Sequence, residues 1–351
     1  MSSRSNICGA AGACLVSAVT LAALTAQTMA QETATFFKGK QLDLIIATPA
    51  GGGYDAYGRL LGRHWGKSIP GNPSLIAKNM PGASGTKALH FLFNIAPRDG
   101  GTVGAVHPGN MLEPILALSN KRVDYDSPKF NFIGSANVET SLCILRADSK
   151  VKSFKDAFET QIVIGGSGTS TVFFPAGHNA LLGTKFKIVP GYGGTAQLNL
   201  AVQRGEVDGF CGQFWSSLNT QNPEWITNGQ FNIIVQEAAR GRAELDRLGV
   251  PLVYDFVKSP EDKLALDLLY LPLTFGRPFV APPAVPADRV AALRQSFDEA
   301  LKDAELLRDA AKMRLPIEPV SGAEVQALVA QLFATPPAVI KRLQEALPKE
   351  E

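Results

Sequence analysis

Short apolar runs alternate with longer amphipathic stretches over most of the chain. The apolar runs predict strands at residues 42–47, 74–78, 102–106, 142–145, 162–164, 186–189, 207–210 and 231–235. Helix-length segments separate them, and the first two lie at 55–67 and 85–94. A regular exchange of strands and helices is typical of parallel sheets covered by helices. The pattern therefore predicts an α/β protein.

The C-terminal part of the chain is more helical. An apolar stripe at helical spacing predicts a helix after Pro286, and its members are Val290, Leu293, Phe297 and Leu301. A second stripe and a Thr-Pro-Pro start predict two further helices, at Val325, Leu328, Val329 and Leu332 and at Thr335, Pro336 and Pro337. Ser321 with Glu324 has the spacing of a capping box, and so has Ser153 with Asp156. We expect the stripes to face the core.

The first thirty residues have the form of a secretory signal peptide. A single charge, Arg4, precedes an apolar run at 8–26, and small residues end at Ala30. The alternative is a retained membrane anchor, which needs about twenty strongly apolar residues, whereas this run is rich in Ala, Gly, Ser and Thr. We therefore expect cleavage after Ala30 and a soluble protein exported to the periplasm.

Composition and charge exclude several classes of protein. Hydrophobic residues make up 45% and charged residues 19% of the 351 residues, a balance typical of a folded globular chain. The formal net charge of +2 gives no basic field that would favour nucleic acid. Four cysteines are too few for a disulfide-dense scaffold. The histidines, at 64, 90, 107 and 178, lack metal-ligand spacing, so we expect no metal and no other cofactor.

Glycine-rich turns lie between predicted strands and helices at four places, residues 48–55, 81–85, 165–171 and 191–195. In open α/β sheets, such turns lie at the carboxyl edge, where ligands bind. Glycine lets backbone N–H groups approach a ligand, and the positive end of a helix dipole favours an anion. Glycine is common in any single turn for conformational reasons, but four glycine-rich turns between strands and helices predict an anion-binding site. Gly51, Gly53 and Ala56 imitate a dinucleotide motif, but the acidic residue expected about twenty positions later is absent.

Several side chains in and near these turns have two interpretations. Asp55 either receives a polar group of the ligand or caps its own helix. Tyr54 and Tyr192 either stack on a planar ligand or belong to the core, and the same holds for Phe214 and Trp215.

An exported serine hydrolase is the alternative function that the turns allow. Ser167 or Ser170 would act as the nucleophile with a histidine as its base. The G-x-S-x-G elbow is absent, however, because Thr169 stands where its last glycine belongs. Binding without chemistry is therefore favoured.

The order of residues in the turns is familiar. It comprises Pro49, Gly51, Gly52, Asp55, Arg59, Asn79, Pro81, Gly82 and Ala83, and it continues at 97–100, 191–194, 204–208 and 282–289. This order resembles that of the Bug family, the solute-binding proteins of tripartite tricarboxylate transporters, over nearly the whole mature chain. The chain departs from the family at Tyr54, where Thr is common, and in segments 107–110 and 232–251.

The resemblance implies a two-lobed periplasmic binding protein of the Venus-flytrap kind, each lobe a mostly parallel sheet flanked by helices. We place lobe I at 31–137 plus 237–351 and lobe II at 138–236. The protein would not be an enzyme. It would be a monomer that captures a small organic carboxylate and delivers it to the membrane subunits of a transporter, or, alternatively, reports it to a signalling system.

The resemblance also implies which residues face the cleft, largely through backbone N–H groups, hydroxyls and bridging water. From the first lobe these are Ala50, Gly51, Gly52, Tyr54, Asp55, Gly82 and Ala83, and His107 joins them because it directly follows a strand. From the second lobe they are Ser167, Gly168, Thr169, Ser170, Tyr192, Gly193, Gly194 and Thr195.

Cys143 and Cys211 are the two cysteines left after cleavage of the signal. Export places them in an oxidising compartment, and the resemblance assigns both to the second lobe in strand-like segments. We expect a disulfide between them. The alternative is two buried free thiols that pack as small apolar residues.

Overall fold

The structure is a computed structural model that describes residues 31–117 and 123–349. The signal peptide predicted at 1–30 lies outside the described residues. The fold contains two sheets, and helices surround both of them.

Six strands form the first sheet, in the order β11-β4-β10-β3-β1-β2. Their bounds are β1 Gln41–Ile46, β2 Ser74–Asn79, β3 Thr102–Ala105, β4 Asn131–Ser135, β10 Pro278–Ala281 and β11 Val320–Ser321. β2 and β3 run parallel to β1, whereas β10 is antiparallel to both β3 and β4, and β11 is antiparallel to β4. Four strands thus share one direction, and β10 and β11 run against them.

Five strands form the second sheet, in the order β7-β6-β8-β5-β9. Their bounds are β5 Ser141–Arg146, β6 Ile162–Gly165, β7 Phe186–Val189, β8 Gly209–Phe214 and β9 Phe231–Glu237. β6 is parallel to β7 and β8, and β5 is antiparallel to β8 and β9. Only β5 runs against the other four strands. The α/β class is confirmed, but the sheets are mixed rather than mostly parallel, because five of the nine strand pairings in the described part of the chain are antiparallel.

The chain passes between the sheets twice, from β4 to β5 and from β9 to β10. The strand that follows each crossing runs against its two neighbours. β5 lies between β8 and β9 in the second sheet, and β10 lies between β4 and β3 in the first. The segment after β9 still packs against the second lobe, because Leu245 and Val250 share an apolar cluster with Leu142. The backbone N–H of Gln236 also donates to the Pro251 carbonyl at 2.8 Å.

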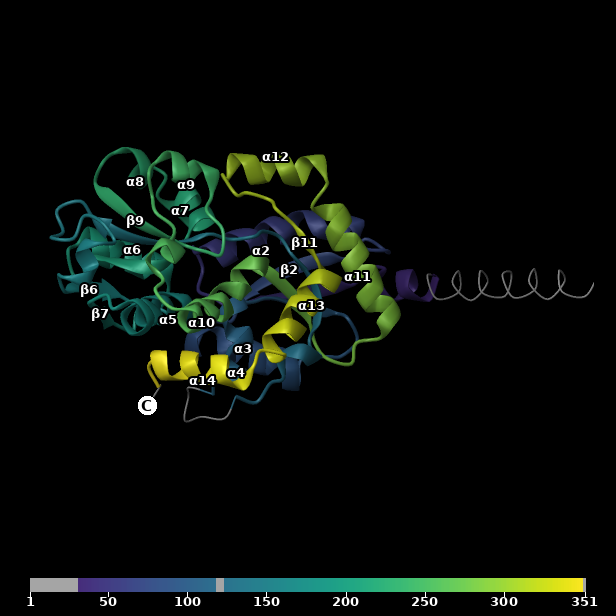
Figure 1. Cartoon of the computed structure of the whole chain (residues 1–351). Coiled ribbons are helices and arrows are strands. Elements are labelled where there is room, and N and C mark those ends of the chain that lie inside the picture. Colours follow the sequence, from purple (N-terminus) through teal and green to yellow (C-terminus); the bar gives the residue numbers. More distant parts are fainter. Residues whose placement is uncertain (1–30, 118–122, 350–351) are drawn as a thin grey trace, which may run out of the picture.

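Helices cover the sheets. Those of the first lobe are α2 Gly53–His64, α3 Thr86–His90, α4 Glu113–Leu116, α10 Pro260–Tyr270, α11 Ala287–Ala300, α12 Ala304–Lys312, α13 Gly322–Phe333 and α14 Pro337–Ala346. Those near the second sheet are α5 Thr169–Gly177, α6 Thr195–Gln203, α7 Trp215–Gln221, α8 Glu224–Thr227 and α9 Ala243–Arg247. Figure 1 shows α6 to α9 gathered with β6, β7 and β9 at one end of the molecule, and α11 toward the other end.

The C-terminal helices form as their sequence predicts. Val290, Leu293 and Phe297 are buried on one face of α11, and Ser321 and Glu324 exchange capping-box hydrogen bonds at the start of α13. Among the described residues, no single helix is long and apolar enough to cross a membrane. Only α13 and α14 taken together pass that test, and they are bent by 84°.

Three local predictions need correction. The helix expected at 85–94 begins as α3 at Thr86 and continues as a π turn at Phe91–Ile95. A 3₁₀ turn at Ala83–Gly85 precedes it and is separated from α3 because Ser84 (φ 51°) and Gly85 (φ 98°) are left-handed. The capping box at Ser153 and Asp156 forms its hydrogen bonds but starts only a 3₁₀ turn. The strand expected at 207–210 begins at Gly209 and runs on to Phe214.

Candidate functional site

The glycine-rich turns lie at the carboxyl ends of parallel strands, as predicted. The turn at 48–52 joins β1 to α2, and the turn at 80–85 follows β2. In the second lobe, the turn at 166–168 joins β6 to α5, and the turn at 190–194 joins β7 to α6. Each turn therefore leads to a helix, whose first N–H groups have no acceptor within the helix itself.

The turns of the two lobes touch one another. A Cβ placed on Gly194 would lie 3.8 Å from Pro49, and one placed on Gly168 would lie 3.8 Å from Ser84. The Gln221 amide on α7 donates a hydrogen bond to the Gly51 carbonyl at 3.1 Å. These contacts place the lobes in a closed arrangement.

The three glycines at the start of α2 differ in their surroundings. Gly51 has φ +87°, a left-handed conformation that favours glycine. Gly52 is extended, and a Cβ there would meet nothing within 4 Å. A Cβ on Gly53 would collide with Ser217 and lie 2.9 Å from Arg277. Gly53 is therefore required by packing between the lobes, whereas Gly52 leaves its backbone open to an approaching molecule.

Asp55 braces this turn. Its buried carboxylate accepts hydrogen bonds from the Gly51 N–H at 3.0 Å, the Arg59 guanidinium at 2.9 Å and the Asn79 amide at 2.9 Å. Burial acts to raise the pKa of Asp55, but these hydrogen bonds outweigh it and hold the pKa below its usual value. Gly52 occupies the N-cap position, so Asp55 reaches back from the first turn. Its carboxylate already has three partners.

A buried ion pair between the lobes was not predicted from the sequence. The Arg277 guanidinium donates to Glu139 at 2.8 Å and to the hydroxyls of Ser216 and Ser217 at 2.6 and 2.9 Å. Arg277 precedes β10 in the first sheet, whereas both serines lie on α7 after β8 of the second. The signal that could have revealed this pair is that Arg277 is the only charged residue between Asp267 and Asp288.

Two tyrosines and an aromatic ring of the second lobe surround this arginine. Its guanidinium lies 4.4 Å from the Tyr54 ring and 5.0 Å from those of Tyr57 and Phe214. The Tyr54 hydroxyl donates to the Gly276 carbonyl at 3.2 Å. The structure therefore places Tyr54 in the core between the lobes. It does not line the cavity between the lobes but packs beside two residues that do, His107 with its ring 4.2 Å away and Phe214 with its ring 6.3 Å away.

The second-lobe turns are partly braced by their own side chains. The N–H groups of Ser167 and Gly168 both donate to the Thr171 hydroxyl, at 2.7 and 3.0 Å, and the Gly193 N–H donates to Gln197 at 2.6 Å. The Tyr192 ring lies over Gly165, within its own lobe. The remaining positions predicted here, Thr169, Ser170, Gly194 and Thr195, stand at the starts of α5 and α6.

A small cavity of about 20 Å³ lies between the lobes. His107 and Gly109 reach it from the first lobe, and Thr169 and Ser170 reach it from the start of α5. Burial and the nearby Arg277 lower the pKa of His107 to about 3, so the imidazole is neutral at physiological pH. Ala50, Gly51, Gly82 and Ala83 lie outside this cavity, on the exposed surface of their turns.

The geometry does not favour a serine hydrolase. Ser170 and His107 line the same cavity, but no hydrogen bond joins them among the described residues. A histidine whose pKa is about 3 is also a weak general base at neutral pH.

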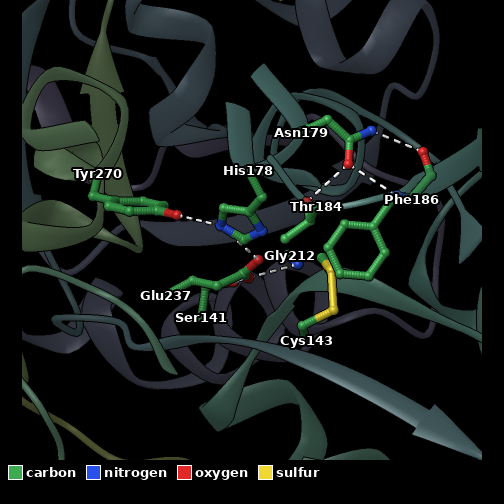
Figure 2. The surroundings of a disulfide bond; sticks show 10 residues. Ser141, Cys143, His178, Asn179, Thr184, Phe186, Gly212, Glu237 and Tyr270 are labelled. Atoms are coloured by element: carbon green, nitrogen blue, oxygen red, sulfur yellow. Dashed lines mark hydrogen bonds and ion pairs between the residues drawn. A yellow bond between two sulfur atoms is a disulfide. The ribbon is translucent and has the colours of Figure 1, made fainter. Parts of the chain in front are cut away.

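Figure 2 shows a second buried cluster, around the disulfide that joins Cys143 on β5 to Cys211 on β8. The His178 ring nitrogen Nε2 is 2.6 Å from the Tyr270 hydroxyl and 3.7 Å from Glu237. Ser141 and the Gly212 N–H donate to the Glu237 carboxyl at 2.7 and 2.8 Å. Burial raises the pKa of Glu237 to about 7 and lowers that of His178 to about 3.

Within the described residues, two groups of side chains are close enough to share a cation. One comprises His178, Cys211 and Glu237, but Cys211 offers no thiolate because it belongs to the disulfide. The other comprises His64, Asp303 and Glu305, and both of its carboxylates already bind the Lys67 ammonium at 2.8 Å. Neither group has the free ligands that a metal site needs.

No protein-family model and no curated protein matches the chain. Solved structures do. A periplasmic binding protein named BugD is 18% identical and has a TM-score of 0.68, with 89% of this chain and 99% of that one covered. MatC from Rhodopseudomonas palustris with bound malate is 18% identical, has a TM-score of 0.65 and covers 88% and 98% of the two chains. A TctC solute-binding protein from Polaromonas is also 18% identical, has a TM-score of 0.61 and covers 87% and 98%. The chain therefore has the two-lobed α/β fold of the periplasmic solute-binding proteins of the TctC and BugD kind.

Proposed function

We propose that this protein is a periplasmic solute-binding protein that captures a small organic carboxylate between its lobes. It would deliver the carboxylate, as a monomer, to the membrane subunits of a tripartite tricarboxylate-type transporter. The observation that carries the proposal is the meeting of glycine-rich turns from two sheets, each turn opening a helix at a carboxyl edge. The fold shared with MatC, whose structure holds malate, supports the same chemistry.

The anion would bind to backbone N–H groups at the starts of α2 and α5. The first N–H groups of a helix lack acceptors within it, and the helix dipole adds about half a positive charge. Gly52 and Gly53 would supply such groups from the first lobe, and Thr169 and Ser170 from the second. Because the bracing contacts of Asp55 and Thr171 fix both turns, these donors would be preorganised before the ligand arrives.

We also propose that the lobes are divided near residues 137 and 237, with the second lobe extended by the segment that follows β9. Leu245 and Val250 support this extension, because both pack in the apolar cluster of the second sheet. The two crossings would then act as the hinge.

A glycine substitution tests this site. Gly52 is extended and its added Cβ would meet nothing within 4 Å, so the fold is expected to tolerate Gly52→Val. The branched side chain would, however, block the approach of a carboxylate to the α2 terminus. The measurement is titration calorimetry with a panel of organic acids that includes malate and citrate.

We expect wild-type protein to bind at least one acid and Gly52→Val to lose that binding by tenfold or more. Gly62→Ala on α2 is the matched control, because its new Cβ would make only ordinary contacts at 3.8 Å or more, and it should bind like wild type. Unchanged affinity in a folded Gly52→Val variant would remove this turn from the site. Failure of every carboxylate to bind the wild type would overturn the function itself.

A further inference from the structure

We propose, as a refinement that rests on the proposed function, that the ligand carries one carboxylate on an apolar body. Its carboxylate would bind at the helix starts, and its body would occupy the cavity between the lobes. Acids of this class include benzoate-like and medium-chain aliphatic monocarboxylates.

The walls of the cavity are mostly apolar. Eight of its twelve lining residues have apolar side chains, and none is charged. The polar lining groups are Thr169 and Ser170 at the start of α5 and His107 of the first lobe. Phe173 and Phe174 on α5, Phe214 on β8 and Leu112, Leu269 and Leu273 of the first lobe supply much of the rest. This arrangement matches a molecule with a polar head and an apolar body.

No charged side chain lines the cavity that would receive a second carboxylate. Arg277 is paired with Glu139 through Nε and has an unpartnered Nη1, and Arg59 is paired with Asp55, but both lie outside the lining. His107 is neutral at physiological pH. Lys87 packs its aliphatic stem on the exposed turn at Gly82 and does not line the cavity. Since each pair sums to no net charge and Lys87 lies outside the lining, the helix start of α5 is the positive group at the cavity itself, and that of α2 lies at the facing turn.

The magnitude of that field limits the number of carboxylates. Each helix start is equivalent to about half an elementary charge, so α2 and α5 together balance about one carboxylate. A second carboxylate on the same ligand would enter the apolar cavity without a cationic partner. Burial of an unpaired ion is strongly unfavourable.

The closed cavity is too small for such a body. Its volume of about 20 Å³ holds a single water molecule. The ligand would therefore enter while the lobes are apart, and closure would press the apolar walls from both lobes onto it. Each buried methylene would then raise the affinity by about threefold to fourfold.

Calorimetry with paired acids tests the refinement on the mature protein. Hexanoate and adipate have the same chain length and differ in one terminal carboxylate. We expect hexanoate to bind at least tenfold more tightly than adipate, and also more tightly than butyrate. If adipate, malate or citrate binds more tightly than hexanoate and benzoate, the refinement is wrong and the proposed function stands. If no carboxylate binds, both are wrong.

A variant provides an independent test. Ser170→Arg places a cation beside the cavity and should shift the ratio of hexanoate to adipate affinity towards adipate by tenfold or more. Ser74→Arg is the matched control, since Ser74 is exposed at the amino end of edge strand β2, opposite the turns, and the ratio should not change. An unaltered ratio in a folded Ser170→Arg protein would contradict the position assigned to the apolar body.

Discussion

Single residues at the base of the cleft show how closely the two lobes fit. Gly53 on α2 leaves the space into which Arg277 and Ser217 extend. Arg277 in turn joins the strand β10 of one sheet to the helix α7 that follows a strand of the other. A buried charge of this kind is tolerated only with a partner of opposite charge, and Glu139 supplies it.

A second single residue, Glu237, predicts how the stability of the fold depends on pH. Burial raises its folded-state pKa to about 7 from an ordinary value of 4.5. Between these values the folded protein holds a proton that the unfolded chain releases, so this carboxyl lowers the stability of the fold as pH rises. At 1.36 kcal/mol per pKa unit, the loss amounts to roughly 3 kcal/mol by pH 7.5.

The variant Glu237→Gln removes this titration. We expect its unfolding free energy, relative to wild type, to improve by roughly 3 kcal/mol between pH 4.5 and pH 7.5 in denaturant titrations. His107 changes stability with the opposite sign below pH 6.5, but it lies away from the substitution and cancels in the comparison. His178 contacts Glu237 at 3.7 Å, so His178→Asn in both backgrounds removes its contribution. The exposed Glu261→Gln control should show no such trend. A difference that is independent of pH would contradict a protonated Glu237.

At the scale of elements, the sequence predicts what depends on local pattern. Apolar spacing predicts the strands that lead into the first two turns and the amphipathic helix α11. Capping residues predict the start of α13. The placement of β10 between β3 and β4 joins strands far apart in the chain, so no local pattern indicates it. The same holds for the partners of Arg277, which lie 60 or more positions away in the chain. Tertiary contacts decide these features.

The disulfide gives a prediction for strands β5 and β8. It links positions 68 residues apart, and the chain-entropy model assigns about 4 kcal/mol of stability to a loop of that length. The double variant Cys143→Ala, Cys211→Ala should lose a comparable amount in denaturant titrations. Reductant should lower the stability of wild type towards that of the variant and leave the variant unchanged. A wild type whose unfolding is indifferent to reductant would contradict a structural role for the bond.

At the scale of the whole molecule, the two crossings connect the lobes, and the glycine-rich turns of both lobes meet at one cleft. Turns from both lobes touch along the closed cleft, at Pro49 with Gly194 and at Ser84 with Gly168. The main apolar core also contains residues of both sheets, so the lobes are packed together as well as tethered. A ligand held by both sets of turns would add its binding free energy to the closed state.

A crystal structure of the mature protein with its tightest-binding organic acid tests the central claim most directly. The account predicts that the carboxylate lies between the lobes. Its oxygens should be within hydrogen-bond distance, about 2.7–3.2 Å, of backbone N–H groups at the starts of α2 and α5. An acid bound elsewhere, or held by one lobe alone through side chains away from these turns, would contradict it.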